Sequence, residues 1–129
     1  MRIPTLCAAA LAAGALSAPA LAQDLGEAQF MANCSACHQP TGLGIKGAFP
    51  ALAGDAVVLG DPAALARLVL NGRGGMPSFR ADLDDAQIAQ ALSYIRMAWG
   101  AAAGAVTPAQ VAAARAGAAA TPAKGLQAH

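Results

Sequence analysis

The segment Cys34-Ser35-Ala36-Cys37-His38 constrains this chain more than any other feature of its 129 residues. Two cysteines three positions apart lie one helical turn from each other, so both thiols face the same side of a helix. A histidine follows directly. Cys-x-x-Cys-His is the attachment signature of c-type haem, in which the thiols reach the two vinyl groups of one porphyrin and the histidine binds iron. The segment therefore predicts one covalent haem c held by Cys34, Cys37 and His38.

Three other interpretations use the same residues. A thioredoxin-like dithiol also contains Cys-x-x-Cys, but it normally accompanies a βαβ pattern, and the sequence shows no strand runs. A zinc site needs four ligands, and the chain beyond residue 22 offers only the motif residues and the terminal His129. A plain disulfide would give no role to His38. The sequence favours haem over these alternatives.

Residues 1–22 are predicted to be a secretory signal peptide. Arg2 gives a positive start, an apolar stretch follows, and the segment ends in Ala20-Leu21-Ala22 before Gln23. This order is typical of an export signal that is cleaved after Ala22. The alternative, a transmembrane anchor, would need an uninterrupted apolar run of about 20 residues, which this segment lacks. We therefore expect a periplasmic protein without a transmembrane segment in its mature chain.

Met76 is the best candidate for a second axial ligand of the iron. It lies in residues 72–79, a glycine-rich segment without helical or strand periodicity, in which Pro77 biases it toward an extended backbone. Met31 precedes the cysteines on the same expected helix and could not reach the far face of the porphyrin. Met97 falls within a helical pattern. A His/Met pair fills both axial sites and raises the potential, which favours electron transfer.

The patterning predicts an all-α domain over residues 23–100, with three main helices. The first is expected over residues 25–38, the second between Asp61 and Gly72, and the third from Asp84, with Gln87 as its capping-box partner. Residues 39–60 are expected to be loop, with residues 57–59 as a candidate strand. Residues 101–129 are expected to be an Ala-rich extension with little packing, helical to Arg115 and disordered from residue 117.

Composition limits both the partners and the core. With 8 Lys and Arg against 7 Asp and Glu, the chain has no basic surface for nucleic acid. Hydrophobic residues make up 57% of the chain, but 38 of its residues are alanines, which bury little surface. We therefore expect the haem to supply part of the core, and the chain without haem to lack a stable fold.

Residues 26–99 resemble the class I c-type cytochromes. In that family a glycine and a phenylalanine on the first helix pack against an aromatic residue on the last helix, and Gly26, Phe30 and Tyr94 stand at the matching positions. The resemblance implies the small cytochrome c fold, in which helices and long loops wrap around one haem.

The same resemblance assigns three further residues of the haem site. Pro50 stands where the family has a proline whose carbonyl accepts a hydrogen bond from the iron-binding histidine, which would orient the ring of His38. Leu52 would pack on the porphyrin. Met76 matches the sulfur ligand of iron.

Residues 38–54 and 94–111 also look like cytochrome subunits of bacterial alcohol, aldehyde and sugar dehydrogenases. Those proteins often carry several haem motifs, whereas this chain carries one. The resemblance implies an electron-transfer protein, not an enzyme, that accepts an electron from a dehydrogenase and passes it to a cytochrome or oxidase. Two alternatives stay open: a subunit bound stably to a dehydrogenase complex, and a haem enzyme or sensor whose iron Met76 does not bind.

Overall fold

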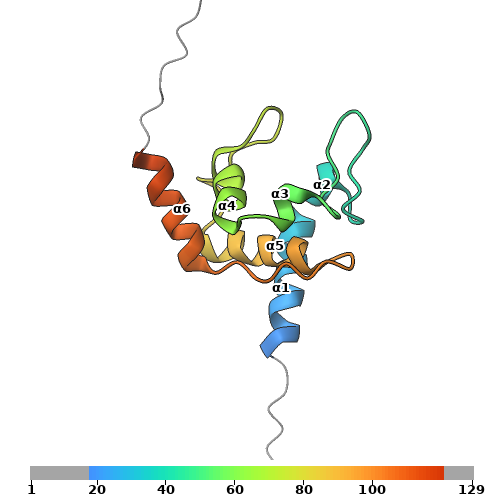
Figure 1. Cartoon of the computed structure of the whole chain (residues 1–129), viewed down its shortest axis with the longest axis horizontal. Coiled ribbons are helices and arrows are strands. Elements are labelled where there is room, and N and C mark those ends of the chain that lie inside the picture. The colour runs from blue at the N-terminus through green and yellow to red at the C-terminus, as the bar shows by residue number, and fades with distance from the viewer. Residues whose placement is uncertain (1–17, 121–129) are drawn as a thin grey trace, which may run out of the picture.

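The computed structural model describes residues 18–120, which form six helices and no strand (Figure 1). Four are long, namely α1 (Ala18–Asn33), α4 (Pro62–Asn71), α5 (Asp85–Met97) and α6 (Pro108–Ala120). Two are single turns, α2 (Ser35–His38) and α3 (Ala56–Leu59). The all-α fold expected from the sequence is confirmed, with one more long helix than the three expected.

Local capping fixes the starts of α4 and α5 as predicted. The Asp61 carboxylate accepts hydrogen bonds from the backbone N–H groups of the second and third residues of α4, at 3.0 and 3.1 Å. At α5, Asp84 accepts from the N–H of Gln87 at 2.8 Å, and the Gln87 side chain accepts from the N–H of Asp84 at 3.0 Å. Each of these caps satisfies amide groups that the helix itself leaves unpaired.

Two local expectations are wrong. The candidate strand at residues 57–59 is helix α3, because the Asp55 carboxylate accepts from the N–H groups of Val57 and Val58 at 2.9 and 3.0 Å and caps a helical turn. The first helix does not run unbroken from residue 25 to 38. It ends at Asn33, and α2 begins one residue later, after Cys34.

Helices α1 and α5 cross closely at Gly26. A Cβ atom at this glycine would lie 2.7 Å from the Gln90 carbonyl oxygen and 2.9 Å from the Tyr94 Cβ, so a larger residue would push the helices apart. One turn further along α1, the buried ring of Phe30 lies 5.4 Å from the Tyr94 ring and 5.5 Å from the Trp99 ring, between centroids. The expected packing of these residues is therefore confirmed.

The expectation of little packing after residue 100 is wrong. Helix α6 packs beside α4 and α5, and Val106, Val111 and Ala114 are buried in the common core (Figure 1). The helix also continues beyond Arg115 to Ala120. Val111 and Ala114 lie three positions apart and so share one face of this Ala-rich helix, which is the face turned to the core.

A buried arginine joins the connection before α6 to the core. Arg96 is 4% exposed, and its guanidinium donates hydrogen bonds to the carbonyls of Val58, Gly60, Ala103 and Gly104 at 2.7–3.0 Å. It holds residues 103–104 against the end of α3. The sequence patterns assign no role to Arg96, but a charged residue next to Ile95 in an otherwise apolar helical stripe is a pattern that could have indicated one.

Most of the predicted signal peptide and of the predicted disordered tail lies outside the described residues, as does His129. Helix α1 begins inside the predicted signal, and residues 20–22, the part of the signal whose burial the structure describes, are exposed. Within residues 18–120, no helix has the length and apolar character needed to cross a membrane.

Candidate haem site

The two cysteines lie where α1 passes into α2. The Cys34 N–H donates to the Phe30 carbonyl at 2.8 Å, and the Cys34 carbonyl accepts from the N–H of His38 at 3.0 Å, so the helical path continues through the break. Both thiols are free. Burial, and secondarily the neighbouring Cys37, raises the pKa of the Cys34 thiol to about 11. Thioredoxin-like dithiols have a lowered thiol pKa, so this environment argues against that alternative.

The imidazole of His38 is held in one orientation. Its side chain is buried, and Nδ1 lies 2.9 Å from the carbonyl oxygen of Pro50. Because a carbonyl can only accept, Nδ1 carries the proton and donates it. This bond is the one that the family resemblance implied, and it leaves Nε2 as the nitrogen with a lone pair for a metal.

The loop that carries Pro50 is itself closed by backbone hydrogen bonds. The Gly44 N–H donates to the His38 carbonyl at 2.9 Å, and the Gly42 carbonyl accepts from the N–H groups of Leu52 and Ala53 at 2.7 and 3.0 Å. Gly42 in turn lies against the ring of Trp99, where a Cβ atom would come within 2.6 Å of the ring carbons. Trp99 therefore packs against the core and also supports this loop.

Gly44 lies at the closest approach between the loop and the Pro50 carbonyl. Its φ is +62°, and a Cβ there would lie 2.5 Å from the Pro50 oxygen and would also contact the Phe49 oxygen. Gly44→Ala is therefore expected to displace the Pro50 carbonyl, on top of about 1–2 kcal/mol for a left-handed alanine. Faster solvent exchange of the His38 Nδ1 proton and a lower unfolding midpoint would measure this.

Gly47→Ala is the matched control for Gly44→Ala. Gly47 lies in the same loop with φ +81°, but a Cβ there would have no atom within 4 Å. It should lower the midpoint by the backbone cost alone and leave proton exchange unchanged. Equal exchange rates in the two variants would show that Gly44 does not protect the His38–Pro50 bond.

Met76 lies in a tight turn anchored to α4. The N–H of Arg73 donates to the Met76 carbonyl at 3.1 Å, and the N–H of Met76 donates to the Arg73 carbonyl at 3.0 Å. Beyond the turn, the Ser78 hydroxyl donates to the Leu70 carbonyl at 2.5 Å, and the Phe79 N–H donates to the Val69 carbonyl at 3.1 Å. The half-buried Met76 side chain is thus carried by a fixed backbone.

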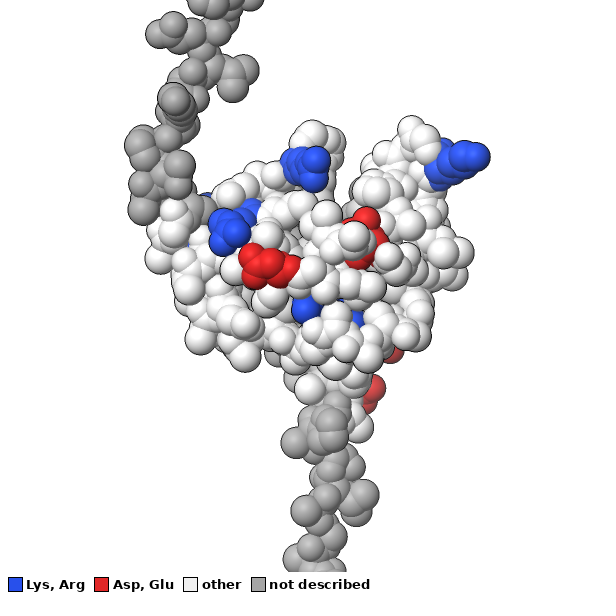
Figure 2. All heavy atoms as spheres, in the orientation of Figure 1, with Lys and Arg blue, Asp and Glu red and all other residues white. Residues whose placement is uncertain are grey.

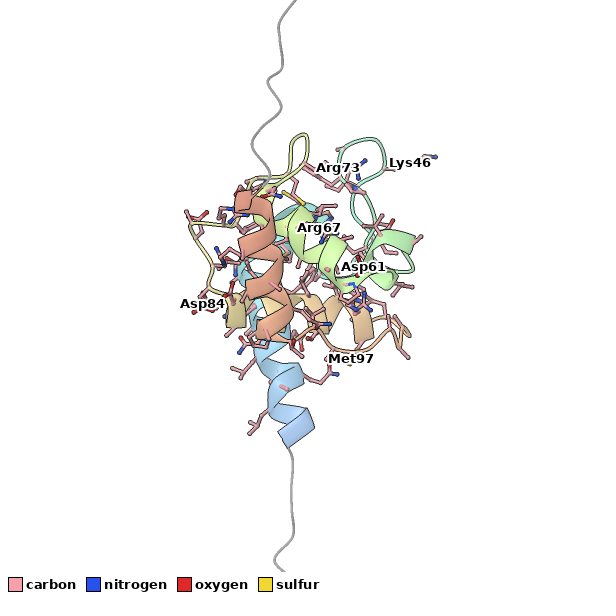
Figure 3. All side chains as sticks on the ribbon, turned by 60° about the vertical axis from the view of Figure 1, so that its left-hand side comes forward. Lys46, Asp61, Arg67, Arg73, Asp84 and Met97 are labelled. Carbon is pink, nitrogen blue, oxygen red and sulfur yellow. The ribbon has the colours of Figure 1, made fainter. Side chains whose placement is uncertain are left out.

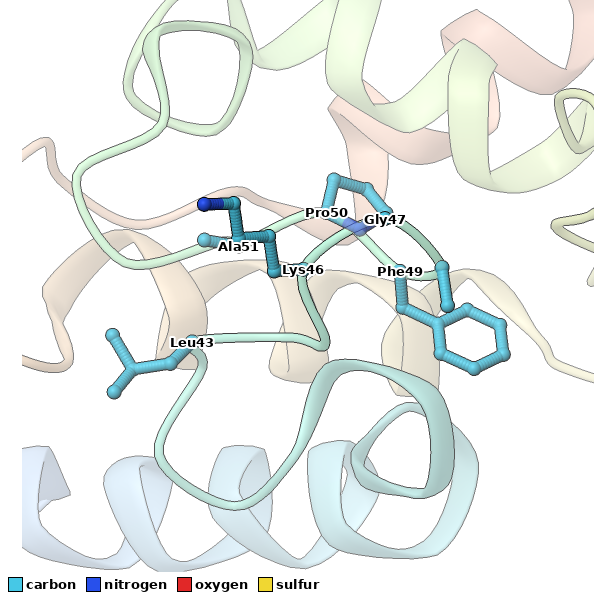
Figure 4. Close-up of a pocket in the computed structure, with 7 residues that line it drawn as sticks. Leu43, Lys46, Gly47, Phe49, Pro50 and Ala51 are labelled. Carbon is cyan, nitrogen blue, oxygen red and sulfur yellow. The ribbon is translucent and has the colours of Figure 1, made fainter.

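A notch separates the two loops that carry Pro50 and Met76. Figure 1 places α2 and residues 43–51 on one side and residues 72–79 on the other, and Figure 2 shows the notch open to solvent. Arg73 and Lys46, labelled in Figure 3, lie on the two loops. The loop that carries Pro50 holds a hollow of about 460 Å³ (Figure 4), lined by residues that include Leu43, Lys46, Phe49 and Pro50.

The residues around the notch fit a haem. Large apolar side chains of the segment that follows His38 are exposed, namely Leu43, Ile45, Phe49 and Val57 at 38–65%. Exposed apolar side chains gathered on one site mark a binding surface. With the two free thiols and the His38 Nε2, they supply the attachment points, the iron ligand and the apolar walls that a porphyrin requires. Leu52 is half-buried against the core, and its contact with the porphyrin stays a prediction.

Comparison with known proteins supports the same cofactor. Residues 21–95 match the family model described as cytochrome c oxidase, cbb3-type, subunit III. A cytochrome c-552 of Thermus thermophilus is 40% identical over 63% of this chain and 64% of its own length. Cytochrome c6 of Diacronema lutheri is 36% identical over 54% of this chain and 88% of its own length.

A third relative is part of a larger assembly by its name. The cytochrome c subunit of alcohol dehydrogenase (quinone) from Gluconobacter oxydans is 33% identical over 58% of this chain. The present chain spans only 18% of that relative's length, and just under two thirds of the Thermus cytochrome. The family match covers more than half of the chain and includes the Cys-x-x-Cys-His segment, α4 and most of α5. The chain therefore belongs to the cytochrome c family whose model is described as cytochrome c oxidase, cbb3-type, subunit III.

Proposed function

We propose that this protein is a periplasmic electron carrier with one haem c, bound covalently through Cys34 and Cys37 and ligated by His38 and Met76. The observation that carries the proposal is the hydrogen bond from the His38 Nδ1 to the Pro50 carbonyl. This bond leaves the lone pair of Nε2 available for a metal and strengthens that nitrogen as a donor, because a partner on one ring nitrogen raises the basicity of the other. When bound, the haem supplies a one-electron couple.

The protein's own residues keep the ligands in place while the charge of the iron changes. His38 is fixed by Pro50, and the Met76 turn is fixed by its bonds to α4. Fixed ligands keep the structural rearrangement between the oxidised and reduced states small. No side chain of the site has to make or break a bond to a substrate, so the protein acts as a carrier and not as an enzyme.

The proposed partners are a donor dehydrogenase and an acceptor cytochrome or oxidase. The loop of residues 43–51 beside the proposed haem would face such a partner, and Lys46 is its basic residue. Redox encounters use small and transient interfaces. With a net charge of +1 over the whole chain, electrostatic steering would be weak.

Two measurements on the wild-type protein test this proposal. Intact mass should equal the chain cleaved after Ala22 plus one haem, with no free thiol. The oxidised protein should show the weak long-wavelength Met–iron band, and the reduced protein should bind carbon monoxide poorly. Ready binding of carbon monoxide without that band would instead establish an open-site haem enzyme or sensor.

A second candidate is a subunit bound stably to a dehydrogenase complex. The observation that favours it is the similarity to the subunit of the Gluconobacter enzyme. Purification of the protein from its own cells would distinguish the two. Elution at the size of the single chain supports the carrier, and elution together with dehydrogenase activity supports the subunit.

A further inference from the structure

The segment that follows Met76 is held by helix α6. The Arg115 guanidinium donates from Nη1 to the Arg80 carbonyl at 2.6 Å and from Nη2 to the Leu83 carbonyl at 2.9 Å. Its Nε lies 2.7 Å from the Asp85 carboxylate, at the start of α5. One side chain thus joins α6 to two points of the segment that follows Met76 and to the first residue of α5.

Arg80 makes the reciprocal contacts. Its Nη1 donates to the Arg115 carbonyl at 3.2 Å, and its Nη2 donates to the Asn71 side-chain oxygen at 3.1 Å. Asn71 is the last residue of α4 and directly precedes the Met76 segment. The two arginines therefore hold the two ends of residues 72–83 together. Arg80 bonds Asn71, the residue before this segment, and Arg115 bonds Arg80 and Leu83 near its end.

These contacts are stronger than ordinary surface ion pairs. The side chains of Arg115 and Asp85 are only 26% and 32% exposed, so solvent screens them less than an exposed pair. Each bond is charge-assisted, and the planar guanidinium meets all three acceptors in one geometry. A lysine ammonium lacks this planar fork and would meet the same acceptors only as a compact point charge.

We infer that Arg115 is a positioning residue for the iron ligand Met76, and that α6 works as a clamp which keeps the ligand loop closed. The inference rests on the proposed ligation of iron by Met76. Arg115 lies 39 residues after Met76, so this inference gives helix α6 a role in keeping the iron ligand in place. Loosening the clamp raises the fraction of molecules in which Met76 has left the iron.

Imidazole measures that open fraction directly. It binds ferric iron only where the sulfur has left, so its apparent affinity rises in proportion to the open population. With the oxidised holoprotein well below its unfolding temperature, Arg115→Ala is expected to bind imidazole about tenfold more tightly than wild type. A tenfold change in affinity corresponds to the free energy of about one charge-assisted hydrogen bond. The Met–iron band should weaken at the same time.

Arg67→Ala is the matched control. Arg67 lies on α4 beside α6, pairs with Asp61 at 3.8 Å, and has no bond to residues 72–83. It removes the same charge and should keep wild-type imidazole affinity. Asp85→Asn removes the negative charge that faces the Arg115 Nε with little change of shape, while the amide oxygen can still accept the hydrogen bond, so a smaller rise in affinity is expected. It decides the matter if Arg115→Ala does not fold.

The outcomes separate this inference from the proposed function. Wild-type imidazole affinity in a folded Arg115→Ala protein, or in Asp85→Asn if the first does not fold, overturns the clamp alone. An equal rise in Arg67→Ala also overturns it, because the effect would then not pass through the Met76 segment. Absence of the Met–iron band in the wild type would refute Met76 ligation, and the clamp with it.

Discussion

Met76→Ala is expected to convert the protein into one with an open iron site. The substitution removes the proposed sulfur ligand, while the turn between Arg73 and residue 76 uses only backbone atoms and should persist. The Met–iron band should disappear, and the reduced protein should bind carbon monoxide readily. The reduction potential should fall by a sizeable part of the roughly 0.8 V over which axial ligands set haem potentials.

Met31→Ala provides the control for this prediction. Met31 is 43% exposed on α1 and lies on the chain before the cysteines. Its removal should leave the band, the potential and the carbon monoxide response unchanged. If the band survived in Met76→Ala and vanished in the Met31 variant, the assignment of the sulfur ligand would be wrong.

The chain without haem is expected to lose its cooperative fold. In a Cys34→Ala, Cys37→Ala protein prepared without haem, the apolar wall at Leu43, Ile45 and Phe49 would face water. Among the described residues the largest fully buried side chains are Phe30, Leu70, Ile88 and Val111, and three of the other eight members of the buried cluster are alanines. Because a domain is stable by only about 5–15 kcal/mol, losing the burial supplied by the haem should remove this margin.

Calorimetry and circular dichroism would check this second prediction. The haem-loaded wild type should unfold in one sharp transition, whereas the double variant should show reduced helicity and a gradual loss of signal on heating. A single sharp transition in the double variant would mean that the α1–α5 crossing and α6 suffice as a core. In that case the haem would add function without adding the fold.

Much of the site was predicted from the sequence because its signals are local. The spacing of Cys34 and Cys37 follows from one helical turn, and the Asp61 and Asp84 caps bond atoms within three residues. The His38–Pro50 bond spans twelve residues and was predicted only through the family resemblance. Helix α3 does not follow from the pattern of residues 39–60, because glycines and prolines dominate this segment and the single capping residue Asp55 is a weak signal among them.

The sequence by itself predicted haem c as the cofactor, and it determined the helical class and the starts of α4 and α5. Only the tertiary structure decided what residues 101–120 do. In sequence, this Ala-rich segment has the composition of an unpacked tail. Whether its small side chains are buried depends on the shape of the surface that they meet, which the sequence alone does not give. The bonds of Arg115 to Arg80 and Asp85 join residues 35 and 30 positions apart, and no local spacing rule reaches that far. The residues proposed to hold the haem follow from their pattern in the sequence, whereas those proposed to keep the Met76 loop closed depend on how α4, α5 and α6 pack.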